Sequence, residues 1–305
     1  MAADPVLTLA DLEAWSRPGT SLAVLGHPVH HSVSPPMHNA ALAALAGRET
    51  RFADWRYFRF DVPPDDLPRA LGWLQAKQFR GVNLTVPHKV IAFDRIATVD
   101  AAARPVGAVN TLRWAERGWH GFNTDGYGLA AAVREALAGE LAGAHIILLG
   151  AGGAAWGAAV ECLQRRCASL WIANRTPENL AVLLAVLRPV AAGIPVRGFA
   201  PGCPPADLPA GALVINATSA GLRAGDPAPI DLAALPRPAA VYDMIYNPAR
   251  TPLLRAAAAL GVPHANGLGM LVHQGAKALE IWSGIPAAQT APAMAAAARA
   301  ALGAA

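Results

Sequence analysis

The sequence contains few of the residues that mark extracellular, nucleic-acid-binding or metal-binding proteins. Cysteine occurs three times in 305 residues (Cys162, Cys167 and Cys203), an odd number without CxxC spacing, which argues against a disulfide framework or a zinc site. Only 15% of the residues are charged, and the net charge is +4. The basic residues are scattered along the chain and form no Lys/Arg-rich block, so no nucleic-acid partner is expected. The N-terminus shows no secretory signal pattern. We therefore expect a cytoplasmic protein.

Long hydrophobic runs are also missing, although 54% of the residues are hydrophobic and the mean hydropathy is +0.30. An apolar stretch near the middle, residues 146–160, is interrupted by glycines and is shorter than the roughly 18–20 residues that a membrane helix needs. We expect no membrane partner. The apolar residues are expected in the core of a folded chain whose length suggests two domains.

Lysine is nearly absent, since only Lys77, Lys89 and Lys277 occur among the 25 basic residues. An ammonium group can release a proton at a useful pH, whereas a guanidinium group cannot. A lysine in such an arginine-rich chain is therefore a candidate for proton transfer, and Lys89 has the polar neighbours to support this interpretation.

Short aliphatic runs alternate with helical stretches along the chain, which predicts an α/β fold. The alternation is more regular in the second half, where it predicts a parallel sheet with helices on both faces. The expected strands are residues 22–25, 81–86, 109–114, 119–122, 145–149, 170–173, 213–216 and 241–244. The expected helices are residues 36–46, 65–78, 125–137, 153–166, 177–187, 252–260, 268–283 and 286–302. We place a domain boundary at the helix that begins at Asp125. This gives a substrate-binding catalytic domain over residues 1–124, completed by C-terminal helices over residues 268–305, and a dinucleotide-binding domain over residues 125–267.

A glycine-rich turn follows the strand at residues 145–149 and opens a helix, in the GxGxxA form of the dinucleotide fingerprint. Its first glycine allows a tight turn, and its second allows close approach of a pyrophosphate to free N–H groups at the helix start. A plain strand-to-helix turn is the alternative. The expected cofactor-binding residues here are Gly150, Ala151, Gly152, Gly153, Ala154 and Ala155.

The next strand ends in Asn174, Arg175 and Thr176, where NAD enzymes usually place an acid on the ribose hydroxyls. No acid is present there to repel a phosphate, and the planar donor fork of Arg175 can bind one. The sequence therefore favours NADP over NAD. A solvated arginine at the strand end is the alternative, and Glu178 could oppose a phosphate.

Polar clusters lie at the ends of the N-terminal strands, where open α/β sheets gather ligand groups. They are Ser32 and Ser34; Asn83, Thr85 and Lys89; Asn110 and Thr111; and Asn123, Thr124 and Asp125. Each also has a structural interpretation: Ser34 and Asp125 are good helix caps, and Asn110 can hold a turn. Together, the clusters predict a site for a small polyol, with one lysine and one carboxylate for proton transfer.

Lys89 and Asp125 would rest as an ion pair if they meet. A free lysine has a pKa of about 10.4, and a neighbouring carboxylate opposes the depression that a base would need. The pair is then better suited to donating a proton to a forming alkoxide than to taking one. Which of the two moves the proton stays open.

The motifs resemble those of the shikimate dehydrogenase family, in order and along nearly the whole chain. They are HHSVSPPMHNAA (residues 30–41), GVNLTVPHK (81–89), GAVNTL (107–112), NTDGYG (123–128), GAGGAA (150–155), NRT (174–176), INATSAGL (215–222), YDMIYNP (242–248) and NGLGMLVHQGA (266–276). The resemblance implies an N-terminal catalytic domain, a Rossmann-type NADP domain and C-terminal helices that return to the first domain, with a cleft between the domains.

The resemblance also implies the activity, which is NADP-dependent reversible reduction of 3-dehydroshikimate to shikimate in aromatic amino acid biosynthesis, without a metal. It assigns catalysis to Lys89 and Asp125. It assigns substrate binding to Ser32, Ser34, Thr85, Asn110, Tyr246 and Gln274, the two serines holding the carboxylate. It places Thr218, Met244 and Gly267 near the nicotinamide.

Two departures keep alternatives open. Many NADP-using relatives carry another basic residue after the NRT segment, whereas this chain continues Pro177-Glu178-Asn179, so NAD is the alternative cofactor. About 20 residues precede the first strand, which resembles the quinate/shikimate dehydrogenase branch. A non-catalytic dinucleotide-binding regulator and a methylenetetrahydrofolate-type dehydrogenase are further alternatives, disfavoured by the Lys–Asp pair and the polyol-binding residues. The small-molecule substrate is the expected partner, and the chain is expected to be a monomer or homodimer.

Overall fold

The computed structural model describes residues 5–303 and divides the chain into two compact units. The first unit runs over Met1–Thr124 and Val272–Ala305, and the second over Asp125–Leu271. Among the described residues, no helix combines the length and apolar character needed to cross a membrane, and no three His, Cys, Asp or Glu side chains gather as a metal site would require.

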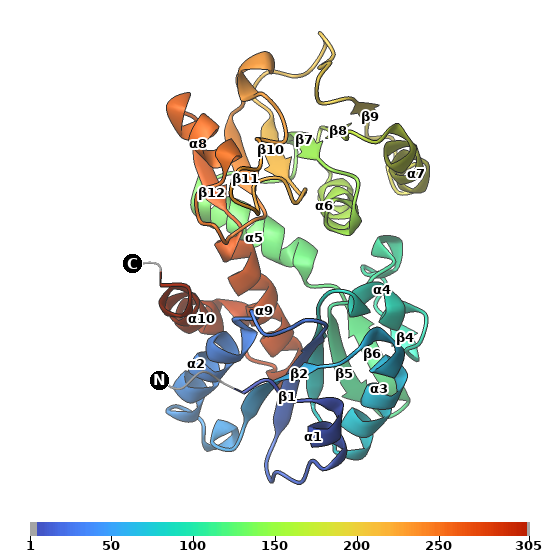
Figure 1. Ribbon diagram of the computed structural model, residues 1–305, viewed down its shortest axis with the longest axis vertical. Helices are drawn as coiled ribbons and strands as arrows, with labels where there is room; N and C mark the ends of the chain where they lie inside the picture. The colour runs from blue at the N-terminus through green and yellow to red at the C-terminus, as the bar shows by residue number, and fades with distance from the viewer. Residues whose placement is uncertain (1–4, 304–305) are drawn as a thin grey trace. The chain divides into compact units, whose positions relative to one another are not determined.

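The first unit is built on a six-stranded mixed sheet with the strand order β2-β1-β3-β5-β6-β4 (Figure 1). Its elements are α1 (Leu9–Glu13), β1 (Ser21–Gly26), α2 (Ser34–Ala46), η1 (Thr50–Phe52), β2 (Arg56–Asp61), η2 (Pro64–Asp66), α3 (Leu67–Ala76), β3 (Gly81–Leu84), α4 (His88–Phe93), β4 (Thr98–Val99), η3 (Arg104–Val106), β5 (Thr111–Ala115), β6 (Gly118–Phe122), most of α9 (Leu268–Ser283), and α10 (Ala287–Ala301). Strands β2, β1 and β3 are parallel, and β5 and β6 form an antiparallel hairpin beside β3. The hairpin makes this sheet mixed.

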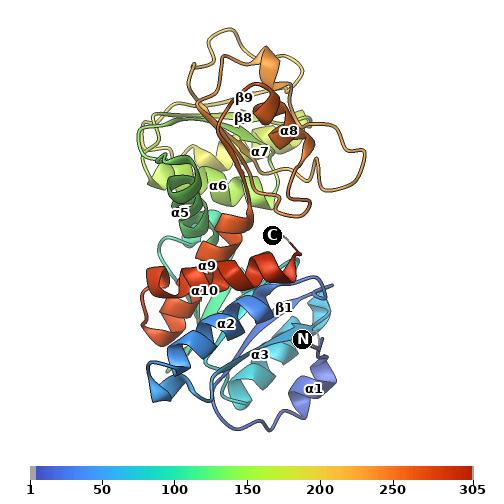
Figure 2. The same ribbon diagram turned by 90° about the vertical axis from the view of Figure 1, so that its left-hand side faces the viewer.

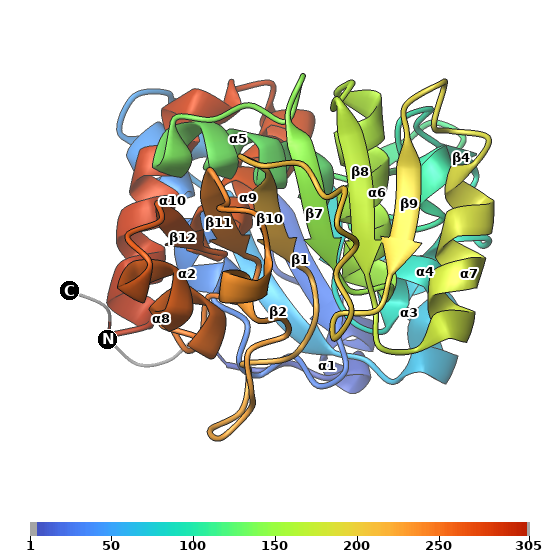
Figure 3. The same ribbon diagram turned by 90° about the horizontal axis from the view of Figure 1, so that it is seen from above.

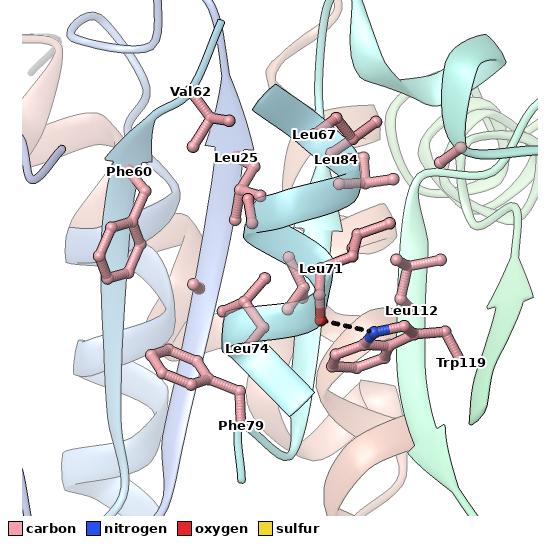
Figure 4. Close-up of a cluster of buried hydrophobic side chains, with 14 of the residues drawn as sticks. Leu25, Phe60, Val62, Leu67, Leu71, Leu74, Phe79, Leu84, Leu112 and Trp119 are labelled. Atoms are coloured by element: carbon pink, nitrogen blue, oxygen red, sulfur yellow. Dashed lines mark hydrogen bonds between the residues drawn. The ribbon is translucent and has the colours of Figure 1, made fainter. Parts of the chain in front are cut away.

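One face of this sheet packs against α1 and α3. Leucines from α3 meet alternate residues of the strands, such as Leu25, Phe60 and Leu84, in a continuous buried cluster (Figure 4). The indole N–H of Trp119 donates a hydrogen bond to the carbonyl of Leu71 at 3.2 Å, so this large ring is buried with its polar atom satisfied.

The opposite face is covered by α2 and α9, and α10 lies alongside α2 (Figure 2). The Trp282 ring from α9 lies directly over Gly81 of β3, where a Cβ would collide with it. Its indole N–H donates to the carbonyl of Leu112 at 2.9 Å. The C-terminal helices therefore complete the core of the first unit.

The second unit is built on a six-stranded parallel sheet with the order β12-β11-β10-β7-β8-β9 (Figure 3). Its elements are α5 (Asp125–Leu137), β7 (His145–Leu149), α6 (Gly153–Gln164), β8 (Ser169–Ala173), α7 (Pro177–Leu187), β9 (Val196–Phe199), β10 (Leu213–Asn216), η4 (Leu232–Ala234), β11 (Ala240–Asp243), α8 (Pro252–Ala259) and β12 (His264–Asn266). The chain runs outward from β7 to β9, then returns to β10 on the other side of β7 and continues to β12. This is the doubly wound order of dinucleotide-binding sheets, with its switch point between β7 and β10.

Four paired strands lie where the sequence predicted none, namely β2, β4, β9 and β12. Ser34, in addition, is not a helix cap. Ser34 is the first residue of α2, and the capping position falls on Val33, which makes no side-chain cap hydrogen bond. Pro35 and Pro36 occupy the first turn of α2, where their missing N–H groups cost nothing. The Ser34 hydroxyl is thereby available for other contacts.

Candidate active site

The predicted substrate residues of the first unit gather at one edge of its sheet. Ser32 and Ser34 follow β1, and Thr85 follows β3, which is parallel to β1. Asn110 directly precedes β5, which is antiparallel to β3, and Thr124 follows β6, which is antiparallel to β5. All of these strand ends therefore meet at the same edge, where ligand groups collect in open sheets.

The segment after β1 is held by a buried arginine of β2. The Arg59 guanidinium donates to the carbonyl oxygens of His30 and Ser32, at 2.6 and 3.1 Å, and Ser34 N donates to the Ser32 hydroxyl at 3.3 Å. Gly26 ends β1, and a Cβ there would collide with the Thr85 side chain. The serine loop and Thr85 are thus close-packed neighbours.

A chain of buried hydrogen bonds runs through the sheet beneath these residues. The Tyr57 hydroxyl donates to Asn83 Oδ1 at 2.7 Å, and Asn83 Nδ2 donates to the Asn110 carbonyl and to Thr111 Oγ1, at 3.1 and 3.0 Å. Burial raises the pKa of Tyr57 well above its ordinary value, and a hydrogen bond with the Ser34 side chain opposes this shift. Ser34 and Asn110 are therefore linked through Tyr57 and Asn83, and the Tyr57 hydroxyl stays protonated and neutral.

Asn110 is the centre of the remaining contacts at this edge. Its Oδ1 accepts hydrogen bonds from Thr124 N at 2.8 Å and from the Thr111 hydroxyl at 3.0 Å, while its Nδ2 donates to Thr124 Oγ1 at 3.0 Å and to Gln274 Oε1 at 3.4 Å. Gln274 comes from α9, more than 160 residues further along the chain. The structure thus brings two predicted hydroxyl-binding amides together.

Lys89 lies at the second position of α4, directly after the turn that follows β3, and is half-buried. Its carbonyl accepts a hydrogen bond from Val109 N at 2.9 Å, which ties α4 to the segment that carries Asn110. Asp125 begins α5 and follows Thr124 directly in the chain. The half-buried lysine therefore belongs to the same edge of the sheet as the amides.

In the second unit, the predicted phosphate-binding turn lies at the switch point of the sheet. Gly150 has φ +112°, a conformation that favours glycine, and a Cβ there would lie 3.0 Å from the Thr218 methyl group that follows β10. Gly152 caps α6, and nothing lies within 4 Å of the Cβ positions of Gly152 and Gly153. Open space above free N–H groups at a helix start fits the pyrophosphate of a dinucleotide.

The residues predicted near the nicotinamide come from the ends of β10, β11 and β12. Thr218 donates through its hydroxyl and its N–H to Asn216 Oδ1, at 2.7 and 3.0 Å. Gly267 packs so closely on the Met244 carbonyl that a Cβ would collide with it. Tyr246 follows β11, and burial raises the pKa of its hydroxyl, so the phenol is neutral.

A cavity of about 520 Å³ lies beyond the ends of β7, β8 and β10. Asn174, Arg175 and Thr176 line it together with Thr218, and Glu178 is not among its lining residues. The segment predicted to bind the adenosine phosphate and Thr218, which was predicted to lie near the nicotinamide, therefore line the same cavity. Ala155, by contrast, is fully buried in α6.

Comparison with known proteins connects both halves of the chain to one family. The family model of the shikimate dehydrogenase substrate binding domain matches residues 24–112, and that of the shikimate 5'-dehydrogenase C-terminal domain matches residues 267–299. The chain is 41% identical over 264 residues to the shikimate dehydrogenase (NADP(+)) of Citrifermentans bemidjiense, covering 86% of this chain and 89% of that one.

Solved structures give the same result over nearly the full length. The shikimate 5-dehydrogenase of Thermus thermophilus, solved with NADP(H) and shikimate, is 36% identical with a TM-score of 0.77, covering 93% of this chain and all of that one. A 5-ketofructose reductase of Gluconobacter is 31% identical with a TM-score of 0.80, covering 92% of this chain and 99% of that one. The same scaffold thus occurs in structures named for two different substrates.

Proposed function

The chain belongs to the shikimate dehydrogenase family, and we propose from this that it catalyses the reversible NADP-dependent reduction of 3-dehydroshikimate to shikimate. The observation that carries the proposal is the single edge of the first sheet that presents Ser34, Lys89, Asn110 and Gln274 together. Ser34 and Asn110 are linked there through the buried Tyr57–Asn83 chain, and Gln274 accepts a hydrogen bond from Asn110. One hydroxyl, two amides and one ammonium suit a small polyol that carries a carboxylate.

Substrate binding is assigned by hydrogen-bonding capacity. The hydroxyls of Ser32 and Ser34 donate to the substrate carboxylate, and the buried Arg59 beneath them keeps their loop in place through two carbonyls. Thr85, Asn110 and Gln274 bind the ring hydroxyls, since an amide offers both a donor and an acceptor. Tyr246 contributes a neutral phenol to the substrate.

The proton that the reaction requires is assigned to Lys89. NADPH, when bound, would supply the hydride that reduces the carbonyl carbon of the substrate. The carbonyl oxygen then needs a proton. The Lys89 ammonium donates this proton from Nζ, with Asp125 as the other member of the proposed catalytic pair. In the reverse direction the neutral amine takes the proton of the hydroxyl, so the same pair serves oxidation.

Cofactor binding is assigned to the second unit. The N–H groups around Gly152 and Gly153 hold the pyrophosphate, Arg175 binds the 2'-phosphate of NADP, and Thr218, Met244 and Gly267 surround the nicotinamide half. In this proposal the first unit is the substrate-binding catalytic domain and the second is the dinucleotide domain. A cytoplasmic location is part of the proposal, since the chain's cysteines are free. So is a monomeric or homodimeric state.

Initial rates on the purified chain test the proposed reaction. NADP and NAD are each supplied with shikimate, with quinate and with the reduced product of 5-ketofructose, and formation of the reduced cofactor is followed by absorbance. The proposal expects kcat/KM for shikimate with NADP to exceed every other combination. A higher value with quinate or NAD would move the chain to the quinate/shikimate branch. Absence of turnover with all of them would contradict an enzymatic role.

A further inference from the structure

Arg223, which no sequence motif singled out, lines the same cavity as Arg175. The cavity of about 520 Å³ has Asn174, Arg175 and Thr176 from the end of β8 on its wall, and Leu222, Arg223 and Asp226 from the segment after β10. The two arginines are 48 residues apart in the chain. They line one cavity because β8 and β10 flank β7 in the sheet.

The segment that carries Arg223 is built by several hydrogen bonds. Asp226 Oδ2 accepts from Gly221 N at 3.1 Å and from Arg223 N at 3.0 Å, and Leu222 N donates to the Ser219 carbonyl at 3.1 Å. Gly221 has φ +102°, and a Cβ there would lie 3.1 Å from Thr251. The backbone of Arg223 is therefore held against the body of the second unit.

The charges of the cavity favour an anion. Two guanidinium groups and one carboxylate, that of Asp226, line the cavity. The Asp226 carboxylate also accepts hydrogen bonds from two backbone N–H groups. These hydrogen bonds and the charge of Arg223 hold the pKa of Asp226 below its ordinary value. The cavity therefore keeps one surplus positive charge. Its two guanidinium groups suit a phosphate monoester, because a dianion is matched better by two cations than by one.

We propose that Arg223 is a second ligand of the 2'-phosphate of NADP and, with Arg175, determines the preference for NADP over NAD. This inference rests on the proposed NADP-linked function and names a residue for it. It also explains how a chain that continues Pro177-Glu178-Asn179 after Arg175 can supply a second cation, since the second cation comes from a different strand end.

Arg223 also borders a second cavity, of about 400 Å³, which provides a matched control. Arg250 and Arg255 line that cavity with Arg223 but do not line the first one. Arg250→Gln therefore makes the same chemical change beside Arg223, outside the proposed phosphate site. If Arg223 serves the second cavity instead, Arg223→Gln and Arg250→Gln will behave alike.

The test measures binding of two fragments by titration calorimetry, independently of turnover. One fragment is adenosine 2',5'-bisphosphate, which carries the 2'-phosphate, and the other is 5'-AMP, which lacks it. Arg223→Gln is expected to weaken the bisphosphate about ten-fold, with 5'-AMP weakened far less, because one charge-assisted hydrogen bond is lost. Arg175→Gln should do the same, and Arg250→Gln should leave both affinities as in the parent chain.

Other outcomes would overturn the inference in distinct ways. An equal loss for both fragments would make Arg223 a support of the loop, and no loss would remove it from the phosphate site. Equal effects of Arg223→Gln and Arg250→Gln would assign it to the second cavity. If the parent chain binds the bisphosphate no more tightly than 5'-AMP, the NADP-linked function itself is contradicted. A rise in KM for NADP at unchanged kcat provides the kinetic counterpart.

Discussion

Lys89 illustrates how one residue type can be selected by its chemistry. The chain uses arginine for almost all of its positive charges, yet a lysine stands at the start of α4, at the edge that also carries Asn110. A guanidinium group would supply the same charge and better hydrogen bonds to a planar acceptor. What it would lose is the ability to release a proton near neutral pH.

Replacement of Lys89 separates charge from proton transfer. Lys89→Arg keeps the charge and Lys89→Ala removes it, and both are expected to lower kcat for shikimate oxidation by about 10²–10⁴-fold, the usual contribution of a positioned acid or base. NADPH affinity, followed by cofactor fluorescence, should change little. The control is Lys77→Arg, whose ammonium lies 5.6 Å from the centre of the Trp73 ring in the parent chain. Parental kcat in the Lys89→Arg variant would exclude proton transfer by this residue.

The residues of the predicted site differ in how far sequence could place them. Three parts of the site lie close to strand ends, namely Lys89, Asn110 and the glycines of the phosphate turn. The apolar pattern that identified those strands in the sequence was therefore sufficient to find them. Arg223 was out of reach, because only the strand order places it across from Arg175. Tyr57 was missed with β2 as a whole.

At the scale of elements, a buried carboxylate ties β10, β11 and α8 together. Asp243 Oδ1 accepts from Asn216 Nδ2 and Ile245 N, at 2.9 and 3.0 Å, and Oδ2 accepts from the Thr251 hydroxyl at 2.6 Å. Thr251 also caps α8 by accepting from Leu254 N at 3.3 Å. Burial raises the pKa of Asp243, and these three donors oppose the shift.

Thr251→Ala is therefore expected to destabilise the second unit. The change removes a helix cap and leaves one oxygen of a buried carboxylate without its donor, which together cost roughly 2–4 kcal/mol in the free energy of unfolding. Thr251→Ser retains the hydroxyl and should recover most of this loss. Urea unfolding followed by far-UV circular dichroism measures both. If the serine and alanine variants are equally destabilised, the hydroxyl is not the stabilising group.

Sequence periodicity predicted the elements with long apolar patterns and missed the short or irregular ones. The predicted helix at residues 177–187 and the strand at residues 213–216 agree with α7 and β10 to the residue. Strand β2 reads RYFRFD, and its Arg59 looks like a surface residue until the carbonyls of His30 and Ser32 are seen to surround it. Strand β12 has three residues, too few to show a period.

At the scale of the whole chain, two cores must form, and the first combines residues from both ends of the sequence. Helices α9 and α10 follow the second unit in the chain, yet the Trp282 ring of α9 packs on Gly81 and near His38 of α2. The order of the elements predicted that the C-terminal helices return to the first domain. Only the structure shows which residues make the contacts. They bury a titratable side chain, which makes stability depend on pH.

His38 is 1% exposed and stacks on the Tyr57 ring, with ring centroids 4.1 Å apart. Burial lowers its pKa from 6.5 to about 3. In the unfolded chain the imidazole takes up a proton as the pH falls through 6.5, whereas the folded protein takes it up only near pH 3. The unfolded state therefore binds more protons in this window, and His38 lowers the free energy of unfolding by up to about 1.4 kcal/mol for each pH unit below 6.5.

His38→Phe keeps an aromatic ring on Tyr57 and removes this titration. Urea unfolding at pH 7 and at pH 5 should show the variant losing about 1–2 kcal/mol less than the parent chain between the two pH values. His88 is present in both proteins, and burial lowers its pKa as well, so its contribution cancels in the comparison. An identical loss in parent and variant would mean that His38 is hydrated enough in the folded chain to be protonated at its ordinary pKa.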